Sequence, residues 1–194
     1  MKIITFSGKA QHGKDTTAKY VKETLQSYGK RVVILHFADY LKYVCKEYFN
    51  WNGIKDEHGR TILQKVGTDL ARKNNPDIWV NVVSDFILAF KTEFDYFLVP
   101  DCRFPNEINL LKEKYYDVYS ILVERSEFDN GLTEEQKSHP SETALDSYNF
   151  DITFTQISGL FFLAKSVPTF CKMVLPFSSL IPSQLKYSLQ TYFK

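Results

Sequence analysis

The sequence predicts an α/β protein with a parallel sheet, and two observations carry this prediction. Short apolar, β-branched runs alternate along the chain with longer stretches whose apolar residues recur at helical steps. In addition, the first apolar run is followed by a glycine-containing loop, a helical pattern and a second apolar run, which is the order of a βαβ unit. The apolar runs predict five strands at residues 2–7, 31–37, 94–99, 118–123 and 150–154, and the periodic stretches predict helices at 15–28, 40–49, 60–74, 78–90 and 106–115.

The composition is that of an ordinary globular domain. The chain has 194 residues, enough for one domain with a real core, and a formal net charge of +1. Because the charge is nearly balanced, we expect no nucleic-acid partner and no attraction to a membrane surface. The sequence contains no uninterrupted run of about eighteen apolar residues, so it predicts no membrane-spanning helix.

The cysteines and the start of the chain point to a reducing compartment. Cys45, Cys102 and Cys171 are scattered, without the paired spacing of a zinc site or the even number of a disulfide frame. The first residues, Met-Lys followed by a predicted strand, do not resemble a signal peptide. We therefore expect free thiols and a cytoplasmic location.

The loop after the first predicted strand has the spacing of a phosphate-binding loop. Gly8 and Gly13 are separated by four residues, and Lys14 follows directly. Glycines allow backbone N–H groups to approach phosphate oxygens, because no Cβ stands in the way. The lysine supplies a mobile cation, and the helix that begins here directs its positive end at the same anion. The alternative is a chance glycine-rich turn.

Three acidic residues stand where a metal ion or substrate can be held. Asp15 takes the position at which Ser or Thr usually ligates Mg²⁺, with Thr16 one place later; it is either a hard oxygen ligand or an acid in the first helical turn. Asp101 ends a predicted strand, within reach of Mg²⁺ or its water. Asp39 also follows a strand, and is either a substrate-side residue or a helix N-cap.

Basic and aromatic residues offer a second anion site. Arg72 and Trp79 bracket a turn, as a guanidinium for a phosphate beside an indole for a base, or as a helix-end arginine and a core tryptophan. Arg103 follows Asp101 by two residues, so both point to the same side of an extended segment. Glu107 is expected to serve the start of the helix at 106–115 or to pin a nearby arginine.

The polar stretch after the fourth strand lacks periodicity and predicts a lid or a surface loop, with Arg125 at its root. Ser141 and Glu142, near its end, also match an N-cap followed by an acid in the first turn. The segment 157–182 is unusually apolar, and predicts a helix packed on the sheet or a tail that binds a partner.

Five segments together resemble the deoxynucleoside monophosphate kinases of tailed bacteriophages and related bacterial reading frames. They are residues 8–16, 66–72, 77–79, 101–107 and 139–146, and the variant Gly-Lys-Asp-Thr at 13–16 narrows the family most. The resemblance covers roughly residues 1–153. It implies the three-layer fold of P-loop NTPases over residues 1–156, with a helical NMP-binding insert at about 39–80, a lid at about 124–143, and an apolar helical extension at 157–194 outside the family pattern.

The resemblance also implies an activity, the transfer of the γ-phosphoryl group of ATP to a deoxynucleoside monophosphate with Mg²⁺. Small-molecule nucleotides would be the partners, and a homodimer is one of the possible assemblies. If the protein is viral, it would act in the host cytoplasm. The implied catalytic residues are Lys14, Arg103 and Arg125, and the implied metal ligands are Asp15 and Asp101. ATP would be bound by Gly8, Lys9, His12, Gly13, Lys14, Asp15, Thr16 and Thr17, and the acceptor by Asp39, Arg72, Trp79, Asp101, Arg103, Ser141 and Glu142.

Two other functions fit the same residues. The first is a kinase of the same fold with another acceptor, such as phosphomevalonate or dephospho-coenzyme A. The second is a catalytically idle nucleotide-binding protein that acts on a partner through its apolar C-terminal segment. Two features motivate the second function: the lid carries fewer arginines than we expect of such kinases, and the C-terminal segment lies outside the family pattern.

Overall fold

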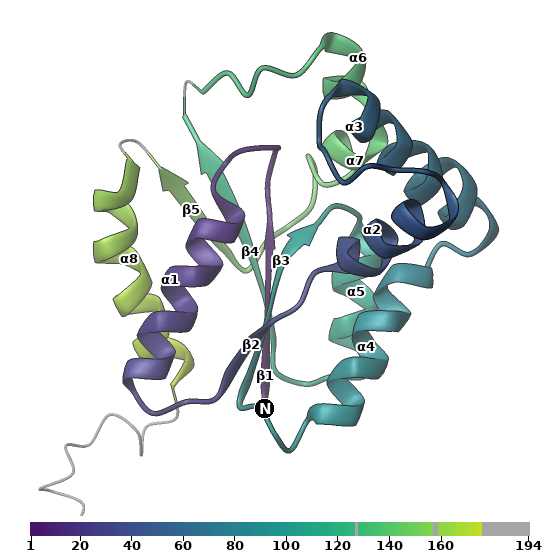
Figure 1. The fold of residues 1–194 in the computed structure, drawn as a ribbon. Helices are drawn as coiled ribbons and strands as arrows, with labels where there is room; N and C mark the ends of the chain where they lie inside the picture. Colours follow the sequence, from purple (N-terminus) through teal and green to yellow (C-terminus); the bar gives the residue numbers. More distant parts are fainter. Residues whose placement is uncertain (127, 157–158, 176–194) are drawn as a thin grey trace, which may run out of the picture.

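The computed structural model describes residues 1–126, 128–156 and 159–175, and its centre is a five-stranded parallel sheet (Figure 1). The strand order is β2-β3-β1-β4-β5, so the first strand lies in the middle. In register, Ile4 is opposite Leu98 on one side and Tyr119 on the other. The strands are β1 (Lys2–Ser7), β2 (Val32–Ile34), β3 (Tyr96–Cys102), β4 (Val118–Arg125) and β5 (Ile152–Gln156).

Helices cover both faces of the sheet, which confirms the predicted α/β fold class. Successive residues of a strand point to opposite faces, so Ile4 and Phe6 pack under α1 and α8, while Ile3 packs under α4 and α5. All three side chains are fully buried. Figure 1 shows these two layers on either side of the strands. Their bounds are α1 (Lys14–Ser27) and α8 (Gly159–Val174) on one face, and α4 (Ile78–Phe90) and α5 (Pro105–Lys114) on the other.

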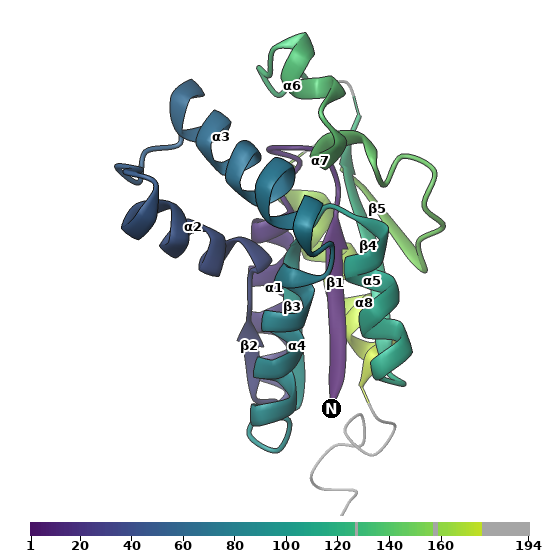
Figure 2. The ribbon, with the colours of Figure 1, turned by 90° about the vertical axis from the view of Figure 1, so that its right-hand side faces the viewer.

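Between β2 and β3 the chain makes a helical excursion beyond the carboxyl edge of the sheet. Cys45, Trp51 and Val66 form a small core of their own there. Figure 2 shows α2 and α3 on one side of the loop that follows β1, with α6 and α7 on the other side. The excursion contains α2 (Phe37–Tyr48), α3 (Glu57–Gln64) and the π-helix η1 (Lys65–Arg72), after which α4 returns to the face of the sheet; the opposite side carries α6 (Glu134–Ser138) and α7 (Pro140–Thr143).

The predicted strand at 31–37 was too long. The strand ends at Ile34, and α2 begins at Phe37 rather than at residue 40. The reason lies on a neighbouring strand, because the carboxylate of Asp101 accepts the backbone N–H groups of Phe37 and Ala38 at 3.0 and 2.9 Å. Asp39 is therefore in the first turn of α2 and not at the end of a strand.

The segment after β4 is more ordered than its missing periodicity predicts, since it contains the short helices α6 and α7. The helix predicted at 60–74 begins earlier, at Glu57, and continues as the π-helix η1. These differences leave the sheet unchanged. They matter because they decide which side chains face the carboxyl edge.

The C-terminal helix α8 belongs to the core. Val167, Phe170 and Cys171 are at most 3% exposed and pack with Val21 and Leu25 of α1. The prediction of a helix packed on the sheet is confirmed for this part, whereas 157–158 and 176–194 lie outside the described residues. In the described part of the chain, no helix has the length and apolar character needed to cross a membrane. The three cysteines are free and buried.

Candidate functional site

The loop between β1 and α1 is tightly curled at glycines. At Gly8, φ is +139°, and a Cβ there would lie 2.1 Å from the carbonyl oxygen of Val123 on β4. Gly13, at φ 87°, is the left-handed residue before α1, and Gln11 also has a positive φ of 62°. The first amides of α1 face the loop, and the positive end of the helix dipole lies with them. This loop is therefore shaped to hold an anion.

Lys14 is the buried cation of this loop. Its side chain donates from Nζ to the carbonyl oxygens of Gly8 and Lys9, both at 2.8 Å, and the residue is 6% exposed. Burial, together with repulsion from Arg103, lowers the pKa of Lys14 to about 7. The carbonyl groups position the amine but carry no full negative charge, so a bound phosphate would satisfy it better.

The two threonines of the first turn differ in their surroundings. The hydroxyl of Thr17 is buried and donates to the carbonyl oxygen of Gly13 at 2.9 Å. Thr16 is exposed. Thr17 thus stabilises the start of α1, while Thr16 is free to meet a ligand from solvent.

Asp15 is paired with a histidine that the sequence did not indicate. Nε2 of His36 lies 3.0 Å from Oδ1 of Asp15, and its Nδ1 lies 3.3 Å from Oδ2 of Asp39. The hydrogen bond lowers the pKa of Asp15 and raises that of His36. Asp39 also pairs with Lys42 at 2.7 Å. Asp15 is therefore held as a carboxylate at the edge of the loop.

The carboxylates of this region can hold Mg²⁺ only together with other ligands. Among the described residues, no cluster of three or more His, Cys, Asp or Glu could bind a metal ion. Mg²⁺ in phosphate sites usually uses one or two carboxylates, and waters and phosphate oxygens complete its shell. Asp15 and Asp101 line the same cavity and fit this requirement. Burial raises the pKa of Asp101.

Arg103 and Glu142 meet at the loop. Oε1 of Glu142 accepts from Nη1 of Arg103 at 2.6 Å, and its Oε2 accepts the N–H of Ala10 at 2.9 Å. The same Nη1 lies 3.4 Å from the carbonyl oxygens of Gly8 and Ser141. The carboxylate of Glu142 thus occupies one amide of the phosphate loop and one guanidinium at the same time.

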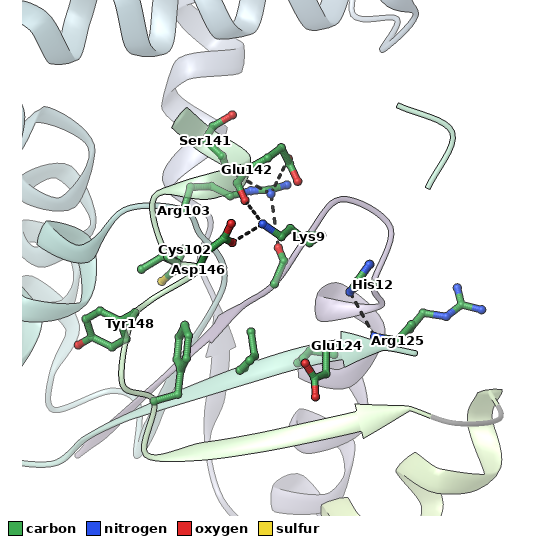
Figure 3. Close-up of a pocket in the computed structure, with 15 residues that line it drawn as sticks. Lys9, His12, Cys102, Arg103, Glu124, Arg125, Ser141, Glu142, Asp146 and Tyr148 are labelled. Atoms are coloured by element: carbon green, nitrogen blue, oxygen red, sulfur yellow. Dashed lines mark hydrogen bonds and ion pairs between the residues drawn. The ribbon is translucent and has the colours of Figure 1, made fainter. Parts of the chain in front are cut away.

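The segment that carries Glu142 is tied to the loop by Lys9. Its Nζ donates to the backbone carbonyl of Glu142 at 2.5 Å and forms an ion pair with Asp146, as Figure 3 shows. These residues line a cavity of about 330 Å³ behind the loop, the Lys9 cavity. Three contacts therefore hold the segment 139–146 over the loop: the two made by Lys9 and the hydrogen bond from the N–H of Ala10 to Glu142.

His12 and Arg125 lie on the side of the Lys9 cavity. Nδ1 of His12 accepts the backbone N–H of Arg125 at 3.2 Å (Figure 3). Burial lowers the pKa of His12, with further repulsion from Lys14 and Arg125. The guanidinium of Arg125 lies 3.7 Å from the ring centroid of Phe128. Arg125 therefore faces an aromatic ring at the root of the segment after β4.

Glu107 joins the two arginines that the sequence proposes for a second anion. Its buried carboxylate forms an ion pair with Arg72 and accepts the backbone N–H groups of Arg103 at 2.6 Å and Phe104 at 3.0 Å. Burial raises the pKa of Glu107 against the pull of Arg72. Both expectations for Glu107 are confirmed, since it serves the start of α5 and pins an arginine.

Arg72 and Trp79 line a cavity of about 150 Å³, the Trp79 cavity. The indole of Trp79 is 3% exposed and donates from Nε1 to the carbonyl oxygen of Gly67 at 3.0 Å. The guanidinium of Arg72 lies 4.2 Å from the ring centroid of Phe104. Trp79 is thus both a core residue and a wall of this cavity.

The Trp79 cavity lies next to a larger one at the loop, the phosphate cleft, of about 450 Å³. Arg103, Asp101 and Ser141 line both. The structure therefore brings Lys14 and Asp15 to one cavity and Arg72 and Trp79 to a neighbouring one with shared wall residues, whereas Asp39 lines neither cavity. The sequence did not indicate three further residues that line the phosphate cleft, His36, Lys55 and Arg60. The available signal was the presence of two cations, Lys55 and Arg60, just before and at the start of the helix predicted at 60–74.

Comparisons with known proteins give a distant structural likeness. Two solved structures of APS kinase from Mycobacterium tuberculosis, a mutant and a complex with AMPPNP and APS, are 14% and 15% identical to this chain. Each alignment covers 89% of this chain, and 93% and 94% of those chains, with TM-scores of 0.43 and 0.45. Values below 0.5 bear on neither substrate nor mechanism. No family model matches the chain.

A curated relative is more similar in sequence. The deoxynucleoside-5'-monophosphate kinase of Escherichia phage T5 is 33% identical over 124 residues. The match covers 60% of this chain and 46% of the relative, so it spans less than half of that protein. It confirms the predicted resemblance to the phage-type deoxynucleoside monophosphate kinases.

Proposed function

We propose that this chain is an ATP-dependent phosphotransferase that moves the γ-phosphoryl group of ATP to a deoxynucleoside monophosphate. The observation that carries the proposal is a pair of neighbouring cavities, one lined by the phosphate loop and the other by Arg72 and Trp79. The loop is one anion site, and Arg72 beside the indole of Trp79 is a second. Two such sites next to each other suit two nucleotides bound with their phosphates facing each other. The similarity to the phage T5 kinase supports this acceptor class.

In this proposal the protein positions two substrates and neutralises their charge. The loop, with Lys9, His12, Lys14, Thr16 and Thr17, holds the ATP phosphates. Asp15 and Asp101 would hold Mg²⁺, which supplies charge neutralisation between the phosphates. No general base is required, because the acceptor is already a phosphate oxygen. The remaining positions are Arg72, Arg103, Asp39, Trp79, Ser141 and Glu142 on the acceptor side, and Arg125 at the root of the lid.

The segment after β4 keeps water away from the transferring group in this scheme. Its attachment to the loop through Lys9 and Glu142 supports this role. We further propose that residues 1–156 form the kinase domain, that 157–194 are an extension of it, and that the enzyme works in a cytoplasm, the host's if the protein is viral.

The test is turnover with a panel of acceptors. The full chain is incubated with radiolabelled ATP, with and without Mg²⁺, and with dGMP, dTMP, dCMP, dAMP or hydroxymethylated dCMP. We expect a labelled diphosphate from at least one of them, and loss of at least 1,000-fold in rate, as an order of magnitude, in Lys14→Ala. Circular dichroism serves as the control that this variant is folded.

The panel also contains phosphomevalonate and dephospho-coenzyme A. Label on one of these alone contradicts the proposed acceptor and selects the same fold with another substrate. Binding of ATP without transfer to any acceptor contradicts the kinase itself. Full activity in Lys14→Ala contradicts the site.

A further inference from the structure

The segment that covers the loop brings almost no free positive charge to the phosphates. Between residues 126 and 146 the sequence contains one lysine and no arginine. That residue, Lys137, pairs with Glu134 at 3.0 Å and with Asp129 at 3.9 Å. Arg125, just before the segment, lies on Phe128. A transferring phosphoryl group spreads negative charge over its outer oxygens, so its charge must be met from elsewhere.

The opposite wall of the phosphate cleft carries cations. Lys42, Lys55 and Arg60 all line it, from the excursion of α2 and α3 (Figure 2). Lys42 is already paired with Asp39. Within the described residues, Lys55 and Arg60 form no ion pair, and Arg60 uses only Nε, which donates to the carbonyl oxygen of Lys55 at 3.3 Å. Two cations thus face the cleft without a counter-ion.

The turn that carries these two cations is firmly built. The indole of Trp51 is 5% exposed and donates to the carbonyl oxygen of Ile54 at 2.9 Å. Asp56 caps α3 by accepting the N–H of Gly59 at 2.7 Å. At Gly59 a Cβ would lie 2.0 Å from the carbonyl oxygen of Ile54, so the turn closes against the helix there. A fixed turn holds Lys55 and Arg60 on the cleft side.

We propose that Lys55 and Arg60 supply the positive charge that faces the transferring phosphoryl group, in place of arginines in the lid. The inference rests on the proposed function. In the transfer, the bond from the γ-phosphorus to the bridging oxygen breaks, ADP leaves with the electron pair, and a phosphate oxygen of the acceptor forms the new bond. In the loose transition state negative charge is spread over the outer oxygens of the γ-phosphoryl group, and two unpaired cations placed beside them lower the barrier.

The surroundings of Lys55 suit this role. Lys55 is exposed at the rim of the cleft; partial desolvation by the protein around it lowers its pKa, with repulsion from Lys42 and Arg60 against attraction from Asp15 and Asp101. Lys55 forms no ion pair among the described residues, so an anion bound in the cleft would offset its repulsion by Lys42 and Arg60. The competing explanation is that Lys55 only balances Asp15 and Asp101, in which case its removal changes Mg²⁺ affinity and not the rate of transfer.

The experiment compares Lys55→Gln, Arg60→Gln and the double variant with Lys65→Gln. Lys65 is exposed, lies on the same excursion and lines none of these cavities, so it controls for the loss of one charge. We expect kcat to fall about 10- to 100-fold in each single variant, and further in the double one, while Lys65→Gln stays within about twofold. The KM of the acceptor should change less than about threefold, and Arg60→Lys should restore part of kcat.

Unchanged kcat in Lys55→Gln and Arg60→Gln, or an equal fall in Lys65→Gln, overturns the inference. A rise in acceptor KM at constant kcat also overturns it, because it places the cations on the acceptor instead. The affinity for inorganic tripolyphosphate, measured by calorimetry, separates this inference from the proposed function. If the wild-type chain transfers no phosphoryl group, the proposed function is wrong. Weaker tripolyphosphate binding by both variants would then still show that Lys55 and Arg60 contact a phosphate chain, whereas binding equal to that of the wild-type chain would overturn the inference as well.

Discussion

Lys14 is nearly buried, but within the described residues its amine is held only by two carbonyl oxygens of its own loop. Burial and the nearby Arg103 bring its pKa to about 7. A buried lysine in this state loses its proton at alkaline pH, and a phosphate beside it restores the charge. Between about pH 7 and 10 the unfolded lysine binds a proton that the folded one has lost, so the contribution of Lys14 to stability rises with pH.

We predict that ATP analogues bind with uptake of a proton at pH 8. The measurement is calorimetry in Tris and in HEPES, whose ionisation enthalpies differ, with a non-hydrolysable analogue. At pH 6 this uptake should disappear, because Lys14 is already charged. Lys14→Arg is the control, since arginine keeps its charge at both pH values. Equal binding enthalpies in the two buffers at pH 8 contradict the prediction.

At this scale the sequence predicted what depends on local geometry. Gly8, Gly13 and Lys14 are recognisable because their spacing alone shapes the loop. His36 and Lys55 were not indicated, because they reach the cleft only through the packing of α2 and α3. The roles of the candidate residues in binding and catalysis stay predictions.

At the scale of elements, apolar patterning predicted the order of helices and strands but not all of their ends. Val32 to Phe37 reads as one apolar run, yet α2 begins within it because Asp101 on β3 binds its first amides. Periodicity cannot detect a carboxylate that arrives from 64 residues away. The apolar composition of 157–182 predicted either a helix packed on the sheet or a tail that binds a partner, and composition alone did not distinguish the two.

We predict that α8 stabilises the fold through one face. Phe170 is 3% exposed and Met173, one turn later, is 73% exposed. Phe170→Ala should lower the free energy of unfolding by about 3 kcal/mol or more, whereas Met173→Ala should change it by less than about 0.5 kcal/mol. Urea denaturation measures both. Equal effects of the two substitutions would mean that α8 is not docked on α1.

At the scale of the whole molecule, three segments distant in sequence surround one space. The loop after β1, the excursion between β2 and β3, and the segment after β4 all line the phosphate cleft. Their meeting follows from the central place of β1, between β3 and β4. That strand order is set by long-range pairing, which periodicity along the chain does not reveal.

We predict that a bisubstrate analogue binds more tightly than its two halves. Because the phosphate cleft and the Trp79 cavity share Asp101, Arg103 and Ser141 as wall residues, we expect adenosine and a deoxynucleoside joined by five phosphates to occupy both at once. Linking two ligands typically gains about 100- to 10,000-fold in affinity. The rise in melting temperature should therefore exceed the summed rises with ATP and the monophosphate. A merely additive rise argues against a shared space, and Lys14→Ala provides the reference.

The ion pair between Arg72 and Glu107 has a mechanical consequence. It fastens the root of the excursion to the first turn of α5, whereas Lys55 is at the far turn between α2 and α3. If α2 and α3 move relative to the sheet, we therefore expect Lys55, which is far from this anchor, to be displaced more than Arg72, which is held by it.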